Sequence, residues 1–172
     1  MGIITPSAPV ILFVGMISGR TMLFDEVRRP LITRFGPVDL ESPVYPWTHT
    51  TYYEKEMGPD LKRQFLFFKQ PIPPDTLHEI KRFTNELEQR WVQTSPERNL
   101  RQINLDPGYL APSKIVLATT KDYSHRIYLR DGIYAEVTLM YQGKSCAPLP
   151  HTYPDFRSEN YIALFNEARR LL

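Results

Sequence analysis

The sequence predicts an α+β fold in a single domain over residues 1–172, and three patterns carry this prediction. Residues 9–17 form a continuous apolar run, which is typical of a strand buried on both faces. Residues 77–91 instead carry apolar side chains at steps of three and four, as an amphipathic helix does. Residues 124–141 alternate around a Gly-containing turn and predict a β-hairpin. No linker or internal repeat separates these patterns.

The composition is that of a typical globular chain, with 42% hydrophobic and 23% charged residues. Its 21 basic and 19 acidic residues give a formal charge of +2, which does not support a dedicated nucleic-acid binder. The longest apolar run, 8–17, is about half of the roughly 20 residues that a membrane helix needs. A single cysteine, Cys146, excludes a disulfide framework and a thiolate metal cluster. We therefore expect a cytoplasmic protein whose partners include neither a membrane nor a nucleic acid.

A helix is expected to follow the first strand. Ser18 suits the N-cap position, and apolar side chains recur on one stripe over residues 23–35. Pro30 is expected to kink or break this helix, because proline lacks a backbone donor. The next elements follow in order: a strand at 38–41, an ordered loop at 43–59 and a strand at 61–69.

The second helix is expected to begin with Asp75 or Thr76 as its N-cap. A strand at 101–105 then leads into Asp106-Pro107-Gly108, which is a turn signal.

The order strand–helix–strand–strand–helix–strand over residues 9–106 predicts a ferredoxin-like split βαβ core. Residues 113–119 suit either a short helix or a further strand. The hairpin at 124–141 and an amphipathic terminal helix at 158–172 are expected to extend the core.

The hairpin around Arg130-Asp131-Gly132 can close in two ways. A two-residue loop would mix charged and apolar side chains on both faces, whereas a three-residue loop with left-handed Gly132 separates them. We therefore prefer the three-residue loop. It pairs Tyr128 with Tyr134, Arg126 with Glu136 and Ser124 with Thr138 on one face, and Leu129 with Ile133, Ile127 with Ala135 and His125 with Val137 on the other.

Strings spread over nearly the whole chain carry a family resemblance, among them LFVGM at 12–16, NLDPGYL at 104–110 and GIYAEVTL at 132–139. They resemble an uncharacterised prokaryotic family, the domain of unknown function numbered forty-four sixteen. The resemblance implies no biochemistry, because the family has no assigned activity, although some members are labelled GTP-binding proteins. This chain has no G-x-x-x-x-G-K-[ST] phosphate loop, and Thr120-Lys121-Asp122 is one residue short of a guanine-reading motif.

Polar and ionisable side chains crowd residues 104–139, which is where we expect a site. Thr119, Thr120, Lys121 and Asp122 supply two hydroxyls, a cation and a carboxylate, a set that can cradle a phosphate or form a solvated loop. Asp106 can act as a base, bind a metal or cap a turn.

The hairpin offers a second group of candidates. Arg126 and Glu136 can form a cross-strand ion pair or bind a planar anion between Tyr128 and Tyr134. His125 can serve as a general base or as a hydrogen-bonded core residue.

The leading hypothesis is a domain that binds, or acts on, an anionic and phosphate-bearing small molecule. Asp106, His125 and Glu136 are the candidates for proton chemistry. The ligand-binding candidates are Tyr109, Thr119, Thr120, Lys121, Asp122, Arg126, Tyr128 and Tyr134. The four histidines lack metal-ligand spacing, so no metal site is assigned, and the sequence does not identify a cofactor. The remaining metal alternative is a hard cation held by Asp106, Asp122, His125 and Glu136. The alternative is a non-catalytic adaptor or assembly subunit whose contact surface is the Pro- and Tyr-rich segment 43–53.

Overall fold

The structure is a computed structural model that describes residues 2–94 and 99–172, and it confirms the α+β class. Its main sheet is antiparallel in the order β11-β10-β8-β7-β1-β4-β2, with β3 added to β4 and β9 added to β10. These strands are β1 Val10–Ser18, β2 Val38–Glu41, β3 Tyr45–Pro46, β4 Lys62–Ile72, β7 Asn104–Ala111, β8 Lys114–Thr119, β9 Ile127–Arg130, β10 Ile133–Gln142 and β11 Ser145–Pro148. A separate small sheet pairs β5 Val92–Thr94 with β6 Asn99–Arg101.

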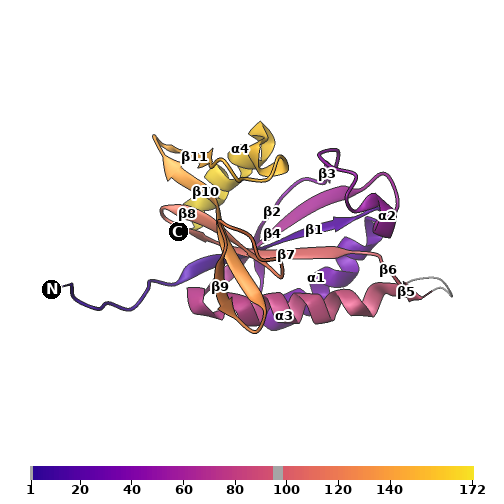
Figure 1. Ribbon diagram of the computed structural model, residues 1–172, viewed down its shortest axis with the longest axis horizontal. Coiled ribbons are helices and arrows are strands. Elements are labelled where there is room, and N and C mark those ends of the chain that lie inside the picture. The colour runs from indigo at the N-terminus through magenta and orange to yellow at the C-terminus, as the bar shows by residue number, and fades with distance from the viewer. Residues whose placement is uncertain (1, 95–98) are drawn as a thin grey trace.

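Helices cover both faces of the sheet. They are α1 Met22–Phe35, α2 Glu54–Met57, α3 Leu77–Glu88 and α4 Glu159–Ala168. Figure 1 shows α1 and α3 on one side of the sheet and α4 on the other. No described helix combines the length and apolar composition that crossing a bilayer requires.

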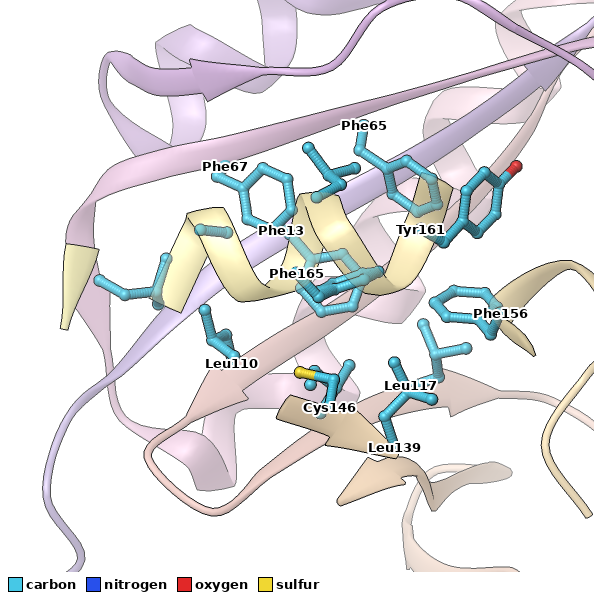
Figure 2. Packing of buried hydrophobic residues seen from close by; sticks show 14 residues of the cluster. Phe13, Phe65, Phe67, Leu110, Leu117, Leu139, Cys146, Phe156, Tyr161 and Phe165 are labelled. Carbon is cyan, nitrogen blue, oxygen red and sulfur yellow. The ribbon is translucent and has the colours of Figure 1, made fainter. Parts of the chain in front are cut away.

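The central strand β1 is buried on both faces, as its apolar run predicts. Leu12 and Val14 pack toward α1 and α3, whereas Phe13 packs toward α4, because successive strand residues point to opposite faces. On the α4 side, the ring of Phe13 meets that of Phe165 at 5.0 Å between centroids (Figure 2). Phe156 lies at one end of this aromatic cluster.

The predicted cap of α1 is wrong, and that of α3 is correct in position at Thr76 but lacks the capping hydrogen bond. Helix α1 begins at Met22, and Ser18 ends β1 instead, where its hydroxyl donates to the Gln102 carbonyl at 2.8 Å. A 3₁₀ turn precedes α3, and Thr76 Oγ1 donates to the Pro73 carbonyl at 2.7 Å instead of accepting from the helix. Pro30 lies inside α1, which continues to its predicted end without a break.

The turn predicted at Asp106-Pro107-Gly108 is also wrong, because these residues lie within β7. The ladder between β7 and β8 ends at Gly108 and Leu117, so Pro107 has one side of the strand without a partner. A Cβ on Gly108 would lie 2.5 Å from the Phe13 ring and from the Val116 carbonyl. The glycine therefore serves close packing rather than a turn, and residues 114–119 resolve as a strand.

The β9–β10 hairpin keeps the predicted register near Tyr128 but closes with a shorter loop. Asp131 and Gly132 both have positive φ, and Arg130 pairs with Ile133. Leu129 is then the extra residue of a bulge, which restores the predicted pairs Tyr128–Tyr134 and Ile127–Ala135.

The rest of the predicted hairpin differs. Strand β9 begins at Ile127, so neither His125 with Val137 nor Ser124 with Thr138 forms a strand pair, and Leu129 does not pair with Ile133. All four residues of β9 are exposed, so the predicted apolar face of this strand does not reach the core.

Candidate functional site

A cavity of about 740 Å³ opens where β7 and β8 separate. Beyond Gly108 and Leu117, β7 continues alongside β1, whereas β8 continues alongside β10. Side chains from both diverging strands line the space between them, Asp106 from β7 and Thr119 from β8. The segment before β4 and the turn before α4 complete the walls, with Trp47 and Phe156 respectively.

An ion pair that crosses the central strand forms part of the cavity wall. Arg63 of β4 is only 1% exposed, and its Nη1 donates to Asp106 Oδ2 at 3.0 Å. Gly15 of β1 lies between the two strands and pairs with Asp106 in register. A Cβ on Gly15 would lie 2.8 Å from Arg63 Nη2, so the guanidinium can cross β1 only because this residue is glycine.

Aromatic rings surround the Arg63 guanidinium. Its Cζ lies 4.8 Å from the centroid of Phe65, 5.3 Å from that of Trp47 and 5.7 Å from that of Phe156. Such cation–π contacts offset part of the free energy lost on burying the charge. The Nε of Arg63 is buried and has no hydrogen-bond partner among the described residues.

Asp106 lies between two cations. Lys81 of α3 places Nζ 3.8 Å from Asp106 Oδ1 and donates to the Leu105 carbonyl at 2.7 Å. Burial acts to raise the pKa of Asp106, but Arg63 and Lys81 outweigh it and hold that pKa below its ordinary value. Asp106 is therefore an ionised carboxylate at neutral pH.

A second charged group joins α2, α3 and β6 at the cavity. Arg101 donates from Nη1 to Glu88 Oε2 at 2.8 Å and from Nη2 to Glu56 Oε2 at 2.9 Å. Glu88 also accepts from the Leu105 backbone N–H at 2.7 Å. Burial raises the pKa of Glu88, while Lys81 and Arg101 oppose the shift.

Lys121 lies on the loop after β8, beside two threonines that line the cavity. Its Nζ donates to the Tyr52 hydroxyl at 2.8 Å and lies 4.3 Å from the centroid of that ring. Its backbone N–H donates to Thr119 Oγ1 at 3.2 Å, and Thr120 lines the cavity next to it. Within residues 2–94 and 99–172, no carboxylate lies within 4 Å of Lys121 Nζ.

Glu136 of β10 is held by the loop that carries Lys121. It accepts from Arg126 Nε at 2.8 Å and from His125 Nε2 at 3.2 Å. Arg126 also donates to the Lys121 carbonyl at 2.9 Å and to the Tyr153 hydroxyl at 2.5 Å. The predicted Arg126–Glu136 ion pair therefore forms, and it fixes the position of the loop.

The structure brings together part of the predicted site. The predicted residues that line the cavity are Asp106, Thr119, Thr120, Lys121 and Glu136. Arg126 and His125 contact Glu136 without lining the cavity, and the ring of His125 stacks on that of His151 at 4.2 Å.

The other four predicted residues neither line the cavity nor contact Glu136. Tyr109 packs against the cluster of Leu77 and Val116 on the α3 side of the sheet. Tyr128 and Tyr134 meet edge to face on the hairpin, with centroids 5.2 Å apart. Asp122 is exposed and does not line the cavity.

Sequence reasoning missed Arg63, Lys81, Arg101 and Asp155, which all line the cavity. Arg63 could have been found, because it lies near the start of a strongly apolar strand. An arginine that such a strand buries needs an acidic partner, and this predicts a buried ion pair. Lys81 and Arg101 carried none, since cations are common on exposed helices and strands.

No group of three or more histidine, cysteine, aspartate or glutamate side chains in the described part of the chain could hold a metal ion.

Comparison with known proteins identifies a family. The family model described as Domain of unknown function (DUF4416) matches residues 8–171. Comparisons with curated proteins and with solved structures gave no match. Because the match spans nearly the whole chain, this protein belongs to the DUF4416 family.

Proposed function

We propose that this domain binds a small anionic molecule, with a phosphate group as the preferred anion, in the cavity between β7 and β8. The observation that carries the proposal is Lys121, a cation that lines the cavity together with Thr119 and Thr120 and has no carboxylate within 4 Å in the described chain. Ammonium and hydroxyl donors together form strong, charge-assisted hydrogen bonds to phosphate oxygens.

The other cations of the cavity support this choice of residue. Arg63 and Lys81 both lie near Asp106, and Arg101 is paired with Glu56 and Glu88. These charges are largely neutralised within the protein, whereas the Lys121 ammonium group donates to the neutral Tyr52 hydroxyl and has no carboxylate within 4 Å among the described residues. A phosphate would replace that neutral contact with an ionic one.

The size of the cavity also suits a small molecule. Ligand pockets usually measure roughly 300–1,000 Å³, and this cavity, at about 740 Å³, lies within that range. Aromatic side chains line it together with the polar ones, among them Trp47, Tyr53 and Phe156.

We infer binding rather than catalysis as the primary function. Asp106 and Glu136, which were predicted to move protons, are each engaged by cations of the protein. His125 contacts Glu136 and does not line the cavity. The assembly alternative has less support, because Trp47 and Tyr53 of the segment 43–53 line the cavity.

We further infer a ferredoxin-like core and a cytoplasmic location. The strand order β7-β1-β4-β2, with α1 and α3 on one face, supports the ferredoxin-like core. If these four strands are numbered along the chain, their order in the sheet is fourth, first, third and second, as in that fold. The single buried cysteine, Cys146, supports the cytoplasmic location.

Thermal unfolding with added ligands tests the proposed function. Inorganic phosphate, glucose 6-phosphate and adenosine monophosphate would each be added to the native protein and to Lys121→Ala. A ligand at 100 times its dissociation constant adds about 2.7 kcal/mol, which raises the melting temperature of a domain of this size by several degrees.

We expect a ligand to raise the melting temperature of the native protein but not that of Lys121→Ala. The matched control is Lys114→Ala, since Lys114 is exposed on β8 and does not line the cavity. A shift that survives in Lys121→Ala, or no shift with any of the three compounds, contradicts the proposal.

A further inference from the structure

Two charged side chains of the cavity lack an opposite charge within 4 Å in the described chain. One is Lys121, and the other is Asp155. The charged side chains of the cavity that do have such a partner are Glu56, Arg63, Lys81, Arg101, Asp106 and Glu136. An acidic group and a basic group are therefore left for a bound molecule to satisfy.

Backbone hydrogen bonds hold Asp155 in place at the cavity. Asp155 begins the 3₁₀ turn Asp155–Arg157, which leads into α4. Its carbonyl accepts from the Ser158 backbone N–H at 3.0 Å and from the Ser158 hydroxyl at 2.7 Å. The residue is only 3% exposed, so its carboxyl group meets little solvent other than that of the cavity.

The environment of Asp155 favours its neutral form. Burial raises its pKa above the ordinary value and Asp106 adds to the shift, while Arg63, the Phe156 backbone N–H and His49 oppose it. The pKa values of the two aspartates of the cavity are thus shifted in opposite directions, because Asp106 has two close cations and Asp155 has none within 4 Å in the part of the chain that the structure describes.

The surroundings select the kind of ligand group that can meet Asp155. Asp106 would repel a second anionic group and Arg63 would repel an ammonium group, so the opposite charges near Asp155 favour neither kind of ion. A hydroxyl carries no charge and can both donate and accept. It therefore hydrogen-bonds to a carboxyl group in either protonation state.

We propose that the ligand is a hydroxylated phosphate ester of the sugar-phosphate class, with its phosphate at Lys121 and a hydroxyl hydrogen-bonded to Asp155. This inference rests on the proposed function and adds the chemistry of the other end of the ligand. Trp47 and Phe156, which line the same cavity, supply apolar surface for the carbon skeleton between the two ends.

Two compounds separate the contributions of the two ends. Glucose 6-phosphate and hexyl phosphate share a phosphate and six carbons, but only the first carries further hydroxyls. Calorimetric titration of the unaltered protein with both compounds therefore measures the effect of the hydroxyls without any substitution. We expect glucose 6-phosphate to bind about tenfold more tightly, as one additional hydrogen bond would give.

Substitutions then locate the preference. Asp155→Ala should bind glucose 6-phosphate and hexyl phosphate with about equal affinity, with the affinity for hexyl phosphate unchanged. Asp155→Asn should restore part of the preference for glucose 6-phosphate. Asp155→Ser serves in place of Asp155→Ala if the latter does not fold. The matched control is Asp39→Ala, since Asp39 is exposed on β2 and does not line the cavity.

Equal affinity of the native protein for both compounds overturns this inference, as does a preference that survives in Asp155→Ala. In both cases the proposed function stands if Lys121→Ala abolishes binding of both compounds. If neither compound binds the native protein, or if Lys121→Ala leaves binding unchanged, the proposed function fails and this inference fails with it.

Discussion

Gly15 shows how a single missing side chain allows a charged group into the sheet. It lies in the buried strand β1, where glycine usually lowers stability by roughly 0.5–1 kcal/mol relative to alanine. Arg63 uses the space above it to reach Asp106 on the far side of the strand. The loss in strand stability is thus offset by an ion pair that no other residue at this position would allow.

Gly15→Ala is therefore expected to destabilise the protein. The new Cβ would lie 2.8 Å from Arg63 Nη2 and 2.9 Å from Phe65 Cε1, so both side chains must move. Overpacking of this kind lowers the free energy of unfolding by about 1–3 kcal/mol, which urea titration measures. Gly2→Ala is the control, because none of the described residues lies within 4 Å of a Cβ added there. Equal urea midpoints for Gly15→Ala and the native protein would refute the prediction.

Asp106→Asn is expected to lower the free energy of unfolding by about 3 kcal/mol at pH 7. This is the low end of the usual range for breaking a buried ion pair, since the Asp106 side chain is 23% exposed. The folded pKa of Asp106 is lowered, so its contribution is complete above its unfolded pKa of about 3.9 and is lost as the pH falls through the folded pKa. Urea titrations from pH 7 downward should show the two proteins converging below about pH 4. A constant difference at every pH would mean that the carboxylate charge is unimportant.

Asp155→Asn should show the opposite pH dependence in the ligand-free protein. A raised folded pKa gives a contribution that is complete below the unfolded pKa, about 3.9, and is lost as the pH rises through the folded pKa. The variant should therefore gain stability relative to the native protein as the pH rises above about 4. Urea titrations at pH 4 and pH 7 measure this change, and a relative loss at pH 7 would contradict it.

At the scale of elements, the loop between β8 and β9 owes its position to Arg126. This one side chain reaches Glu136 on β10, the carbonyl of Lys121 on the loop and the Tyr153 hydroxyl near α4. The loop is therefore fixed to the walls of the cavity before any ligand binds. Lys121 is held in place as a consequence.

Arg126→Ala is expected to lower the free energy of unfolding by about 3 kcal/mol, because Glu136 is only 2% exposed and would lose its closest cation. Affinity for glucose 6-phosphate should also fall by about tenfold, since Lys121 loses its anchor. Arg130→Ala on the same hairpin is the control. Its side chain is 74% exposed, so a change within about 0.5 kcal/mol is expected.

Calorimetry and urea titration measure the two effects of Arg126→Ala. An Arg126→Ala protein as stable as Arg130→Ala would show that the loop has other anchors.

Elements were predictable where the local pattern and the tertiary contacts agree. Strand β1 and helix α3 have strong periodicity, and both form as expected. Asp106-Pro107-Gly108 has the chemistry of a turn but lies in a strand, because Gly108 is needed for contact with Phe13 and β8 leaves β7 beside Pro107. Sequence alone cannot show such a contact between strands.

At the scale of the whole molecule, the cavity depends on strand order. Arg63 and Asp106 lie on strands separated by β1, and Lys81 reaches them from a helix on the side of the sheet opposite α4. Asp106, Glu136 and the residues at 119–121 could be predicted as candidates because they lie in one polar stretch of the sequence. Their convergence with Lys81, Arg101 and Asp155 could not, since it follows from where β7 and β8 separate.

A nuclear magnetic resonance titration with glucose 6-phosphate tests the central claim most directly. In amide ¹⁵N–¹H spectra we expect the largest shifts at Thr120, Lys121 and Phe156, and small ones at exposed Lys114. Shifts of this pattern, absent in Lys121→Ala, would place the anion in the cavity. Shifts centred on Lys114 or on other exposed cations, or none at millimolar ligand, would contradict a binding site between β7 and β8.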